Sequence, residues 1–160
     1  MDIIVKPVAY VRNSRLTPGD DFWGGTISEI ELAPEVAEEA LDGIELFSHL
    51  EIIYYFNRTG DGDIGAGDGK IAFSRRPRGN PAYPQMGIFA QRNKDRPNSL
   101  GLTTVELFGH SGRVIKVRYL DAIDGTPVLD IKPVFREFQS KPPVRQPEWV
   151  DDLMKDYWKI

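Results

Sequence analysis

Short runs of β-branched and alternating apolar residues, each bounded by Gly, Pro, Asn or Asp, recur along the chain. Runs of this kind are typical of β-strands. Because no regular alternation of strands with long helical patterns accompanies them, the sequence favours a mainly β fold. We expect a single closed or nearly closed β-barrel rather than a doubly wound sheet. The predicted strands are residues 8–11, 27–32, 50–56, 71–74, 86–90, 102–108, 114–119 and 128–132.

Helical patterns are few. Residues 34–41 begin at Pro34 and carry acidic side chains close behind, as the first turn of a helix favours. Residues 147–158 place apolar side chains along one helical face. A stripe of this kind usually packs on its own domain, and otherwise covers a partner subunit. The stripe consists of Trp149, Val150, Leu153, Met154, Tyr157 and Trp158.

These patterns divide the chain into a β-barrel domain, residues 1–140, and a linker with a C-terminal amphipathic helix, residues 141–160. The dipeptide Pro142-Pro143 marks the linker. Inside the barrel domain, the turn-forming residues 109–112 lie between two β-branched runs. They predict a hairpin over residues 102–119.

The composition narrows the chemistry. A chain of 160 residues suits one domain. The absence of cysteine excludes disulfides, thiolate metal sites and cysteine nucleophiles, and with only two histidines, His49 and His110, no metal site is expected. No apolar run approaches the ~20 residues of a membrane span, and the first residues lack the pattern of a signal peptide. We therefore expect a cytoplasmic protein.

The charge is unevenly distributed. The formal net charge is −4, from 20 basic and 24 acidic side chains. Residues 1–69 hold 4 basic and 14 acidic groups, residues 70–118 hold 10 and 2, and residues 119–160 hold 6 and 8. A middle segment with a net charge of +8 indicates a polyanion partner, and Arg75, Arg76 and Arg78 are the candidates for contacting RNA. Alternatively, these side chains face several directions and pair with the acidic first third.

A glycine-rich run, residues 60–69, matches the spacing of a dinucleotide-binding loop. A dinucleotide site needs a helix directly after that loop, and Ala66-Gly67-Asp68-Gly69 cannot start one. Asp61 and Asp63 would also repel phosphate. The run is interpreted as a loop between strands.

Polar clusters interrupt the apolar strands at residues 54–59, 91–99 and 121–127, and rigid loops on a β scaffold are where sites usually lie. The clusters and their flanking residues include the stretches Phe47-Ser48-His49-Leu50, Gly87-Ile88-Phe89-Ala90-Gln91-Arg92, Arg96-Pro97-Asn98 with Gly101, and Asp124-Gly125-Thr126-Pro127-Val128-Leu129-Asp130-Ile131-Lys132-Pro133. Together these stretches resemble the TsaA-like (YaeB/TrmO) family.

The resemblance implies a homodimeric β-barrel that uses S-adenosyl-L-methionine to methylate tRNA, at N6 of the threonylcarbamoylated adenosine beside the anticodon. Alternatives are a noncatalytic barrel that binds a nucleotide or RNA, and a methyltransferase that acts on a small molecule. Carried over residue by residue, the cofactor contacts implied by the family are Asn57, Arg58, Arg92, Arg96, Asp124, Gly125, Thr126, Pro127 and Val128.

Chemistry suggests roles for some of these residues. An arginine is suited to the cofactor carboxylate because its guanidinium binds carboxylates in a bidentate manner. Asp130 is the first candidate for orienting or deprotonating the adenine amine, with Lys132 and Asn98 holding polar groups of the modified base. Alternatively, Asp130 and Lys132 form a structural salt bridge.

One stretch departs from the family pattern. Family members with tRNA activity typically carry Pro-Arg-Gln-Pro-Gly after the first strand, where residues 15–24 here are acidic and aromatic. Donor binding therefore transfers better than the identity of the methyl acceptor. Phe22 and Trp23 in this stretch are expected either to stack on a base or on the cofactor adenine, or to pack in the core or at a dimer interface.

Overall fold

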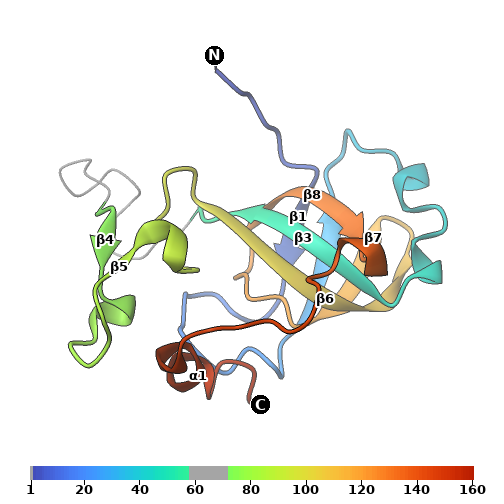
Figure 1. Ribbon diagram of the computed structural model, residues 1–160. Helices are drawn as coiled ribbons and strands as arrows, with labels where there is room; N and C mark the ends of the chain where they lie inside the picture. The colour runs from blue at the N-terminus through green and yellow to red at the C-terminus, as the bar shows by residue number, and fades with distance from the viewer. Residues whose placement is uncertain (1, 58–71) are drawn as a thin grey trace.

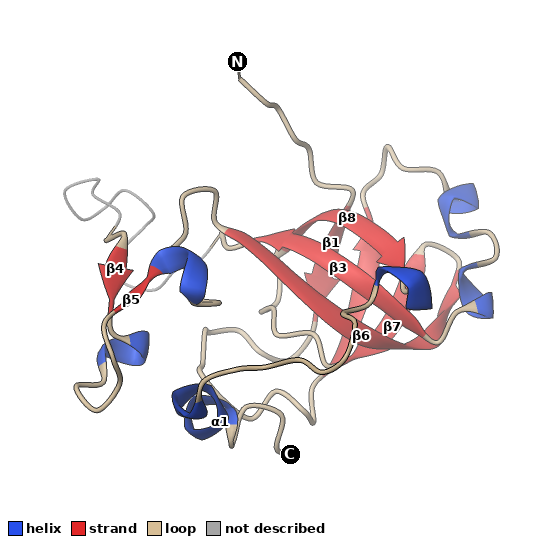
Figure 2. Cartoon of the chain, in the orientation of Figure 1, coloured by secondary structure: helices blue, strands red, loops and turns tan. Residues whose placement is uncertain are grey.

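The computed structural model describes residues 2–57 and 72–160. Six antiparallel strands close into a barrel in the order β1-β2-β7-β6-β3-β8 (Figures 1 and 2). Full closure leaves no unpaired strand edge. The structure confirms a mainly β fold with one closed barrel. The strands are β1 (Ala9–Arg12), β2 (Ile27–Leu32), β3 (His49–Tyr55), β6 (Leu100–Ser111), β7 (Val114–Arg118) and β8 (Pro127–Pro133).

Alternate side chains of the strands fill the barrel interior. In β2, Ser28, Ile30 and Leu32 are buried while their neighbours are exposed, as the two-residue period of a strand requires. The same alternation in the other strands completes one apolar core. Its fully buried members include Val11, Ile30, Leu50, Ile52, Val105, Ile115, Val117 and Val128.

A smaller lobe lies beside the barrel (Figure 2). It contains β4 (Ser74–Arg75) and β5 (Met86–Gly87), an antiparallel pair. The predicted strand 86–90 is wrong beyond Gly87, because residues Ile88–Ala90 form a 3-10 turn. Ile88 donates its N–H to the carbonyl of Phe73, at 2.9 Å, and its own carbonyl accepts from Gln91 at 3.3 Å. The apolar run therefore turns away from the two-stranded sheet.

The predicted hairpin is present, but its turn lies further along the chain. β6 continues to Ser111, and only Gly112 and Arg113 separate it from β7. The pairing register shifts between Leu107 and Gly109, and Gly109 has a φ of 134°. Gly109 thus serves a β-bulge inside the hairpin, where its positive φ is tolerated, and not the turn.

The helices are shorter than predicted. Within 34–41 only a 3-10 turn, Glu38–Leu41, forms, and a second one follows at Ile44–Leu46. The C-terminal helix α1 spans Glu148–Met154. Other 3-10 turns are Pro77–Gly79 and Arg136–Phe138. Among the residues that the structure describes, no helix is long and apolar enough to cross a membrane.

Residues 147–160, the C-terminal segment, pack on the same chain. Figure 1 places α1 beside the gap between the lobe and the barrel, with the C-terminus close to it. The backbone N–H groups of Phe22 and Trp23 donate to the carbonyls of Asp156 and Tyr157, at 3.1 and 2.8 Å. The apolar stripe thus faces its own domain, the first of the two alternatives.

Candidate functional site

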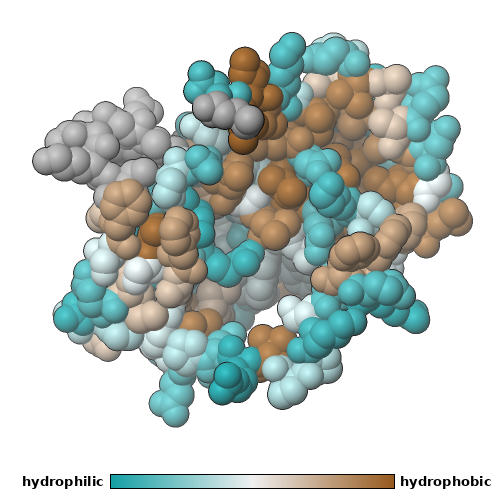
Figure 3. Space-filling view, turned by 45° about the horizontal axis from the view of Figure 1, so that its top comes forward, coloured by the Kyte–Doolittle hydropathy of each residue, from teal (hydrophilic) through white to brown (hydrophobic). Residues whose placement is uncertain are grey.

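A cavity of about 1180 Å³ opens between the barrel, the lobe and the C-terminal segment. Figure 3 shows the hollow that separates the lobe from the barrel. The barrel contributes Tyr54, Thr103 and Asp121, and the lobe and its loops contribute most of the charged side chains. The charged lining residues are Asp20, Arg75, Arg76, Arg78, Arg92, Lys94, Asp95, Arg96 and Asp121.

Gln91 fixes the loop that follows the lobe. Its side chain is buried, and its Nε2 donates to the carbonyls of Arg75 and Met86, each at 2.9 Å. One Arg96 nitrogen, Nη1, donates to the carbonyls of Ile88 and Gln91, at 3.3 and 2.6 Å. These bonds hold the polar cluster against the lobe, so its side chains meet the cavity in a defined arrangement.

The cationic side chains of the site differ in how they are paired. Arg75 forms a 2.5 Å ion pair with Asp95, which also contacts Lys94 at 3.0 Å. Burial acts to raise the pKa of Asp95, but the hydrogen bonds and charges of Arg75 and Lys94 outweigh it and lower that pKa. Arg92 donates from Nη2 to the carbonyl of Leu102 at 2.5 Å and is exposed. Among the described residues, no carboxylate contacts the remaining N–H groups of its guanidinium.

Arg78 pairs with the acidic first third of the chain. Its Nη1 and Nη2 bind the two carboxylate oxygens of Asp21 at 2.9 and 2.8 Å. Asp20 adds a carbonyl contact at 3.0 Å. For this arginine, the alternative of internal pairing holds. The guanidinium of Arg76 instead donates to the carbonyls of Pro81 and Tyr83.

A carboxylate surrounded by hydroxyl groups lies in the barrel wall of the cavity. Asp121 Oδ1 accepts hydrogen bonds from Tyr54, at 2.9 Å, and from Thr103, and its Oδ2 accepts one from Tyr157 at 2.5 Å. Burial, followed by the charge of Asp121, raises the pKa of Tyr54 and the pKa of Tyr157. Both phenols therefore remain protonated donors, and Tyr157 ties the C-terminal segment to the barrel.

An amide of the polar cluster has an unused acceptor. The two carbonyls bound by Gln91 Nε2 fix the orientation of that amide, so Gln91 Oε1 faces Asn93 Nδ2 at 3.2 Å. Among the residues that the structure describes, no donor reaches the buried Oδ1 of Asn93. A buried unpaired acceptor is unfavourable, and a ligand N–H is one group that can satisfy it.

The stretch that departs from the family pattern forms part of the cavity rim. The Arg15 guanidinium stacks on the Trp23 ring at 4.0 Å, and the Trp23 indole N–H donates to the Gly19 carbonyl at 3.2 Å. Trp23 is buried, whereas Phe22 is largely exposed. Of the two expected alternatives, packing is thus the one observed for Trp23.

The structure brings some of the predicted site residues to the cavity and leaves others outside it. The cavity is lined by Asn57, Arg92, Arg96 and Thr126 of the predicted cofactor contacts, and by all three predicted RNA contacts, Arg75, Arg76 and Arg78. Arg58 lies outside the described residues. Predicted residues that do not line the cavity are Asp124, Gly125, Pro127, Val128, Asn98, Asp130 and Lys132.

The Asp124–Gly125 turn supports the site from behind. The Asp124 carboxylate accepts the backbone N–H of Asn13 at 3.2 Å, and Gly125, with a φ of 77°, donates its N–H to Val11 at 2.8 Å. Val128 is fully buried in the barrel core. This turn positions the buried Thr126, which does reach the cavity.

The predicted catalytic residues lie on the outside of the barrel. Asp130 and Lys132 form a 2.6 Å ion pair in β8, with side chains 47% and 56% exposed. A hydrogen bond to Asp130 raises the pKa of Lys132. Asn98 is exposed in a turn closed by a 3.0 Å bond from the Ser99 N–H to the Arg96 carbonyl. The salt-bridge alternative describes the observed contacts of this pair.

Sequence reasoning missed the hydroxyl-bound carboxylate. Tyr54 and Asp121 are the first residues of two of the predicted polar clusters. The sequence therefore indicated where these residues lie but not what they do. Thr103 faces inward from a strand, and Tyr157 was assigned only to an apolar stripe. Nothing local in the sequence connects Tyr157 to Asp121, which precedes it by 36 residues. Alternation along β3 and β6, which turns Tyr54 and Thr103 inward, was the available signal.

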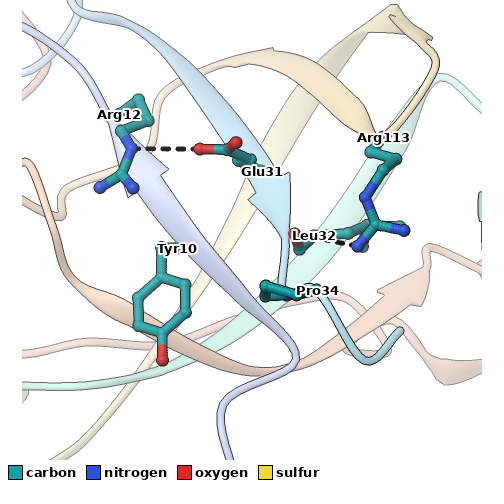
Figure 4. A pocket seen from close by; sticks show the side chains of 6 residues that line it. All are labelled: Tyr10, Arg12, Glu31, Leu32, Pro34 and Arg113. Atoms are coloured by element: carbon teal, nitrogen blue, oxygen red, sulfur yellow. Dashed lines mark hydrogen bonds and ion pairs between the residues drawn. The ribbon is translucent and has the colours of Figure 1, made fainter. Parts of the chain in front are cut away.

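A second, shallower cavity of about 530 Å³ lies on the outer side of β1 and β2 (Figure 4). Its charged groups are already engaged. Arg12 pairs with Glu31 at 3.3 Å, and Arg113 donates to the carbonyls of Val36 and Leu32, at 2.6 and 3.3 Å. The larger cavity is therefore the candidate site. Within residues 2–57 and 72–160, no group of three or more His, Asp or Glu side chains is placed to hold a metal ion.

Comparisons with known proteins agree with this fold. The family model of the tRNA-methyltransferase O N-terminal domain matches residues 15–140. A probable S-adenosyl-L-methionine-binding protein of Methanothermobacter thermautotrophicus is 35% identical over 144 residues, covering 88% of this chain and 96% of that protein. A tRNA (adenine(37)-N6)-methyltransferase of Escherichia coli is 41% identical over 117 residues, covering 69% of this chain and 46% of that enzyme.

A solved structure shares the architecture. The crystal structure of TrmO superposes with a TM-score of 0.70 at 28% identity, covering 91% of this chain and 64% of that one. The chain thus spans nearly all of the archaeal relative, but less than half of the E. coli enzyme and under two thirds of the solved TrmO chain. The family model covers most of the chain, which belongs to the family of the tRNA-methyltransferase O N-terminal domain.

Proposed function

We propose that the chain binds S-adenosyl-L-methionine in the large cavity and methylates N6 of an adenine in tRNA, at the threonylcarbamoylated adenosine beside the anticodon. The observation that carries this proposal is the cavity itself. In a barrel of this family, four of the implied cofactor contacts, Asn57, Arg92, Arg96 and Thr126, line one hollow. The E. coli relative is named a tRNA (adenine(37)-N6)-methyltransferase, which supports the reaction type.

The residues present fit the donor. Its carboxylate needs a cation, and Arg92 has guanidinium donors left after its bond to Leu102. Its adenine needs aromatic faces and hydrogen-bonding groups, which Phe56, Trp149 and the unpaired acceptor of Asn93 provide in the cavity wall. When bound, the donor supplies a methyl group on a positively charged sulfur.

The chain contributes position more than covalent chemistry, since methyl transfer to an amine needs no enzyme intermediate. Holding the two reacting groups in line removes much of the entropic barrier. Asp130, Lys132 and Asn98 keep their proposed role on the base only if tRNA or a second copy of the chain brings the base to the outer face of β8. Loss of methyl transfer with unchanged donor binding in Asp130→Asn is the result expected of that role.

We further propose a cytoplasmic homodimer. Three apolar side chains support the pairing: Tyr55, Leu100 and Leu102 point outward from β3 and β6 and are 37%, 43% and 46% exposed. Tyr55 is directly opposite Leu100 in the pairing register, so the three form one stripe. Apolar stripes of this kind are common at interfaces between proteins. Sedimentation velocity of the wild type and of Leu102→Glu tests the pairing, which predicts that the charged variant is monomeric.

A donor-binding protein without RNA methylation is the second candidate. It is favoured by one fact: the relative that this chain covers over 96% of its length is named a probable S-adenosyl-L-methionine-binding protein. This candidate shares the cavity and the donor with the first. Only turnover separates them.

The test combines calorimetry with methyl transfer. Donor affinity is measured on the purified chain, which is then incubated with labelled donor and total tRNA from a normal strain or from one lacking the threonylcarbamoyl modification. Label that appears in normal tRNA, and not in the unmodified tRNA, supports the proposed reaction. Donor binding without label in either tRNA refutes methylation of tRNA and favours the second candidate. Absence of donor binding refutes both.

A further inference from the structure

Three carboxylates line the large cavity: Asp20, Asp95 and Asp121. Two of them are matched by arginines. Asp95 binds Arg75 at 2.5 Å, and Asp20 lies 4.0 Å from the Arg78 guanidinium. Asp121 differs, because none of the ion pairs within residues 2–57 and 72–160 includes it. The cavity therefore contains one carboxylate whose charge is not neutralised by a described cationic side chain.

Three hydroxyl groups hold the Asp121 carboxylate in place. They belong to Tyr54, Thr103 and Tyr157, and they donate to its two oxygens. Tyr54 is 2% exposed and Thr103 7%, so the barrel holds two of the three donors rigidly. The negative charge is thus fixed in place before any ligand binds.

A fixed anion in a partly enclosed cavity selects a cation. Water screens charges, so the attraction between opposite charges becomes stronger where water is excluded. Arg92 and the neighbouring arginines supply positive charge to the same cavity. The cavity is therefore suited to a ligand that carries both a negative group and a positive group.

We infer that Asp121 is the counter-charge for the positively charged sulfur of the methyl donor, and that it makes the site prefer donor over product. This inference rests on the proposed function. During transfer the carbon–sulfur bond breaks as the carbon–nitrogen bond forms, the sulfur keeps the electron pair, and the amine proton passes to water. The sulfur is then neutral, so the attraction to Asp121 is lost and the product is released more easily.

The side chains around Asp121 allow the inference to be tested with single substitutions. Asp121→Asn removes the charge and keeps the shape of the side chain, so the cavity volume changes little. Tyr157→Phe keeps the charge of Asp121 and removes one of its three hydrogen bonds, and so measures how much any effect comes from loosening the C-terminal segment. Asp156→Asn is the matched control. It removes a negative charge from the residue before Tyr157, and the Asp156 side chain pairs with Lys159 at 2.7 Å and does not line the cavity.

The experiment measures by calorimetry the binding of three ligands to the wild type and to these three variants. The ligands are S-adenosyl-L-methionine, its demethylated thioether product, and the analogue in which a protonated amine replaces the sulfonium. We expect Asp121→Asn to lose at least tenfold in affinity for the two ligands charged at that position and less than twofold for the thioether. Tyr157→Phe and Asp156→Asn should keep the wild-type ratio between charged and neutral ligands.

Each other outcome contradicts the inference in a distinct way. Equal losses for all three ligands in Asp121→Asn would show that Asp121 serves structure or the shared amino group of the ligands, and unchanged affinities would show that it contacts no charge. A changed ratio in Tyr157→Phe would assign the effect to the C-terminal segment. If the wild type binds none of the ligands, both the inference and the proposed function are refuted. The other outcomes contradict the inference alone and leave donor binding by the wild type intact.

Discussion

Gly24 is the residue on which the attachment of the C-terminal segment depends most directly. A Cβ atom at this position would lie 1.9 Å from the carbonyl oxygen of Trp158 and 2.8 Å from its carbonyl carbon. Both are backbone atoms, which cannot rotate away as the end of a side chain can. In Gly24→Ala the C-terminal segment must therefore move from the barrel. The effect is steric, since the added methyl group has no room.

The cost follows from the contacts that this movement breaks. Two backbone hydrogen bonds join the segment to the 22–23 stretch, at 3.1 and 2.8 Å, and Tyr157 donates a third bond, to Asp121, at 2.5 Å. A hydrogen bond contributes about 0.5–1.5 kcal/mol net, so the three together contribute roughly 1.5–4.5 kcal/mol. For a domain of this size, 1 kcal/mol shifts the melting temperature by about 2–4 °C. With the middle of that range, about 3 kcal/mol, we expect Gly24→Ala to melt roughly 6–12 °C below the wild type.

Tryptophan fluorescence provides a local readout. All three tryptophans of the chain, Trp23, Trp149 and Trp158, line the cavity that the segment closes. Detachment should shift their emission to longer wavelength and speed hydrogen exchange in the C-terminal segment. The matched control is Gly25→Ala, whose Cβ would lie 3.2 Å from Cγ2 of Ile160, a side-chain methyl that can move. Equal stability and emission of the two variants would refute the steric reasoning.

Two further predictions concern charges of the site. The lowered pKa of Asp95 means that the Arg75 pair stabilises the fold above about pH 4, the ordinary carboxyl pKa, and that this contribution is lost as the pH falls through the lowered value. Asp95→Asn should therefore lose less stability than the wild type in urea titrations from pH 5 to pH 3; parallel losses would contradict this. Arg76→Ala should weaken tRNA binding and lower its salt slope by about 1, whereas Arg78→Ala, whose charge is already paired, should change the slope less. Equal slopes would show that the internal pair does not matter.

The barrel was predictable because its signal is local. In β2 the apolar Ile30 and Leu32 alternate with Glu29 and Glu31, which is the pattern that predicts the strand at residues 27–32. Prediction failed where tertiary contacts override a local preference. Ile88 and Phe89 are good strand residues, yet after the Ile88 N–H bonds to Phe73 of the lobe, the Ile88 carbonyl accepts the N–H of Gln91 and closes a turn. Gly109 was assigned to the turn because a bulge and a turn both favour glycine.

The candidate site was predictable only in part, for a related reason. The arginines of the 91–96 loop reach the cavity because their cluster follows the short turn after β5, and this order is visible in the sequence. The Asp121 network joins β3, β6, the loop after β7 and the C-terminal segment. No single stretch contains that combination. Its recognition requires knowing that the chain end folds back against the loop after β7.

The basic middle segment combines two effects that the sequence could not separate. Arg78 is neutralised by Asp21, in a contact that leaves its side chain 29% exposed, whereas Arg76 binds only backbone carbonyls among the described residues. In the proposed complex with tRNA, a phosphate would have to displace Asp21 from a two-point contact, and the displaced carboxylate would repel that phosphate. We therefore expect Arg78 to add less affinity for tRNA than an arginine without an acidic partner.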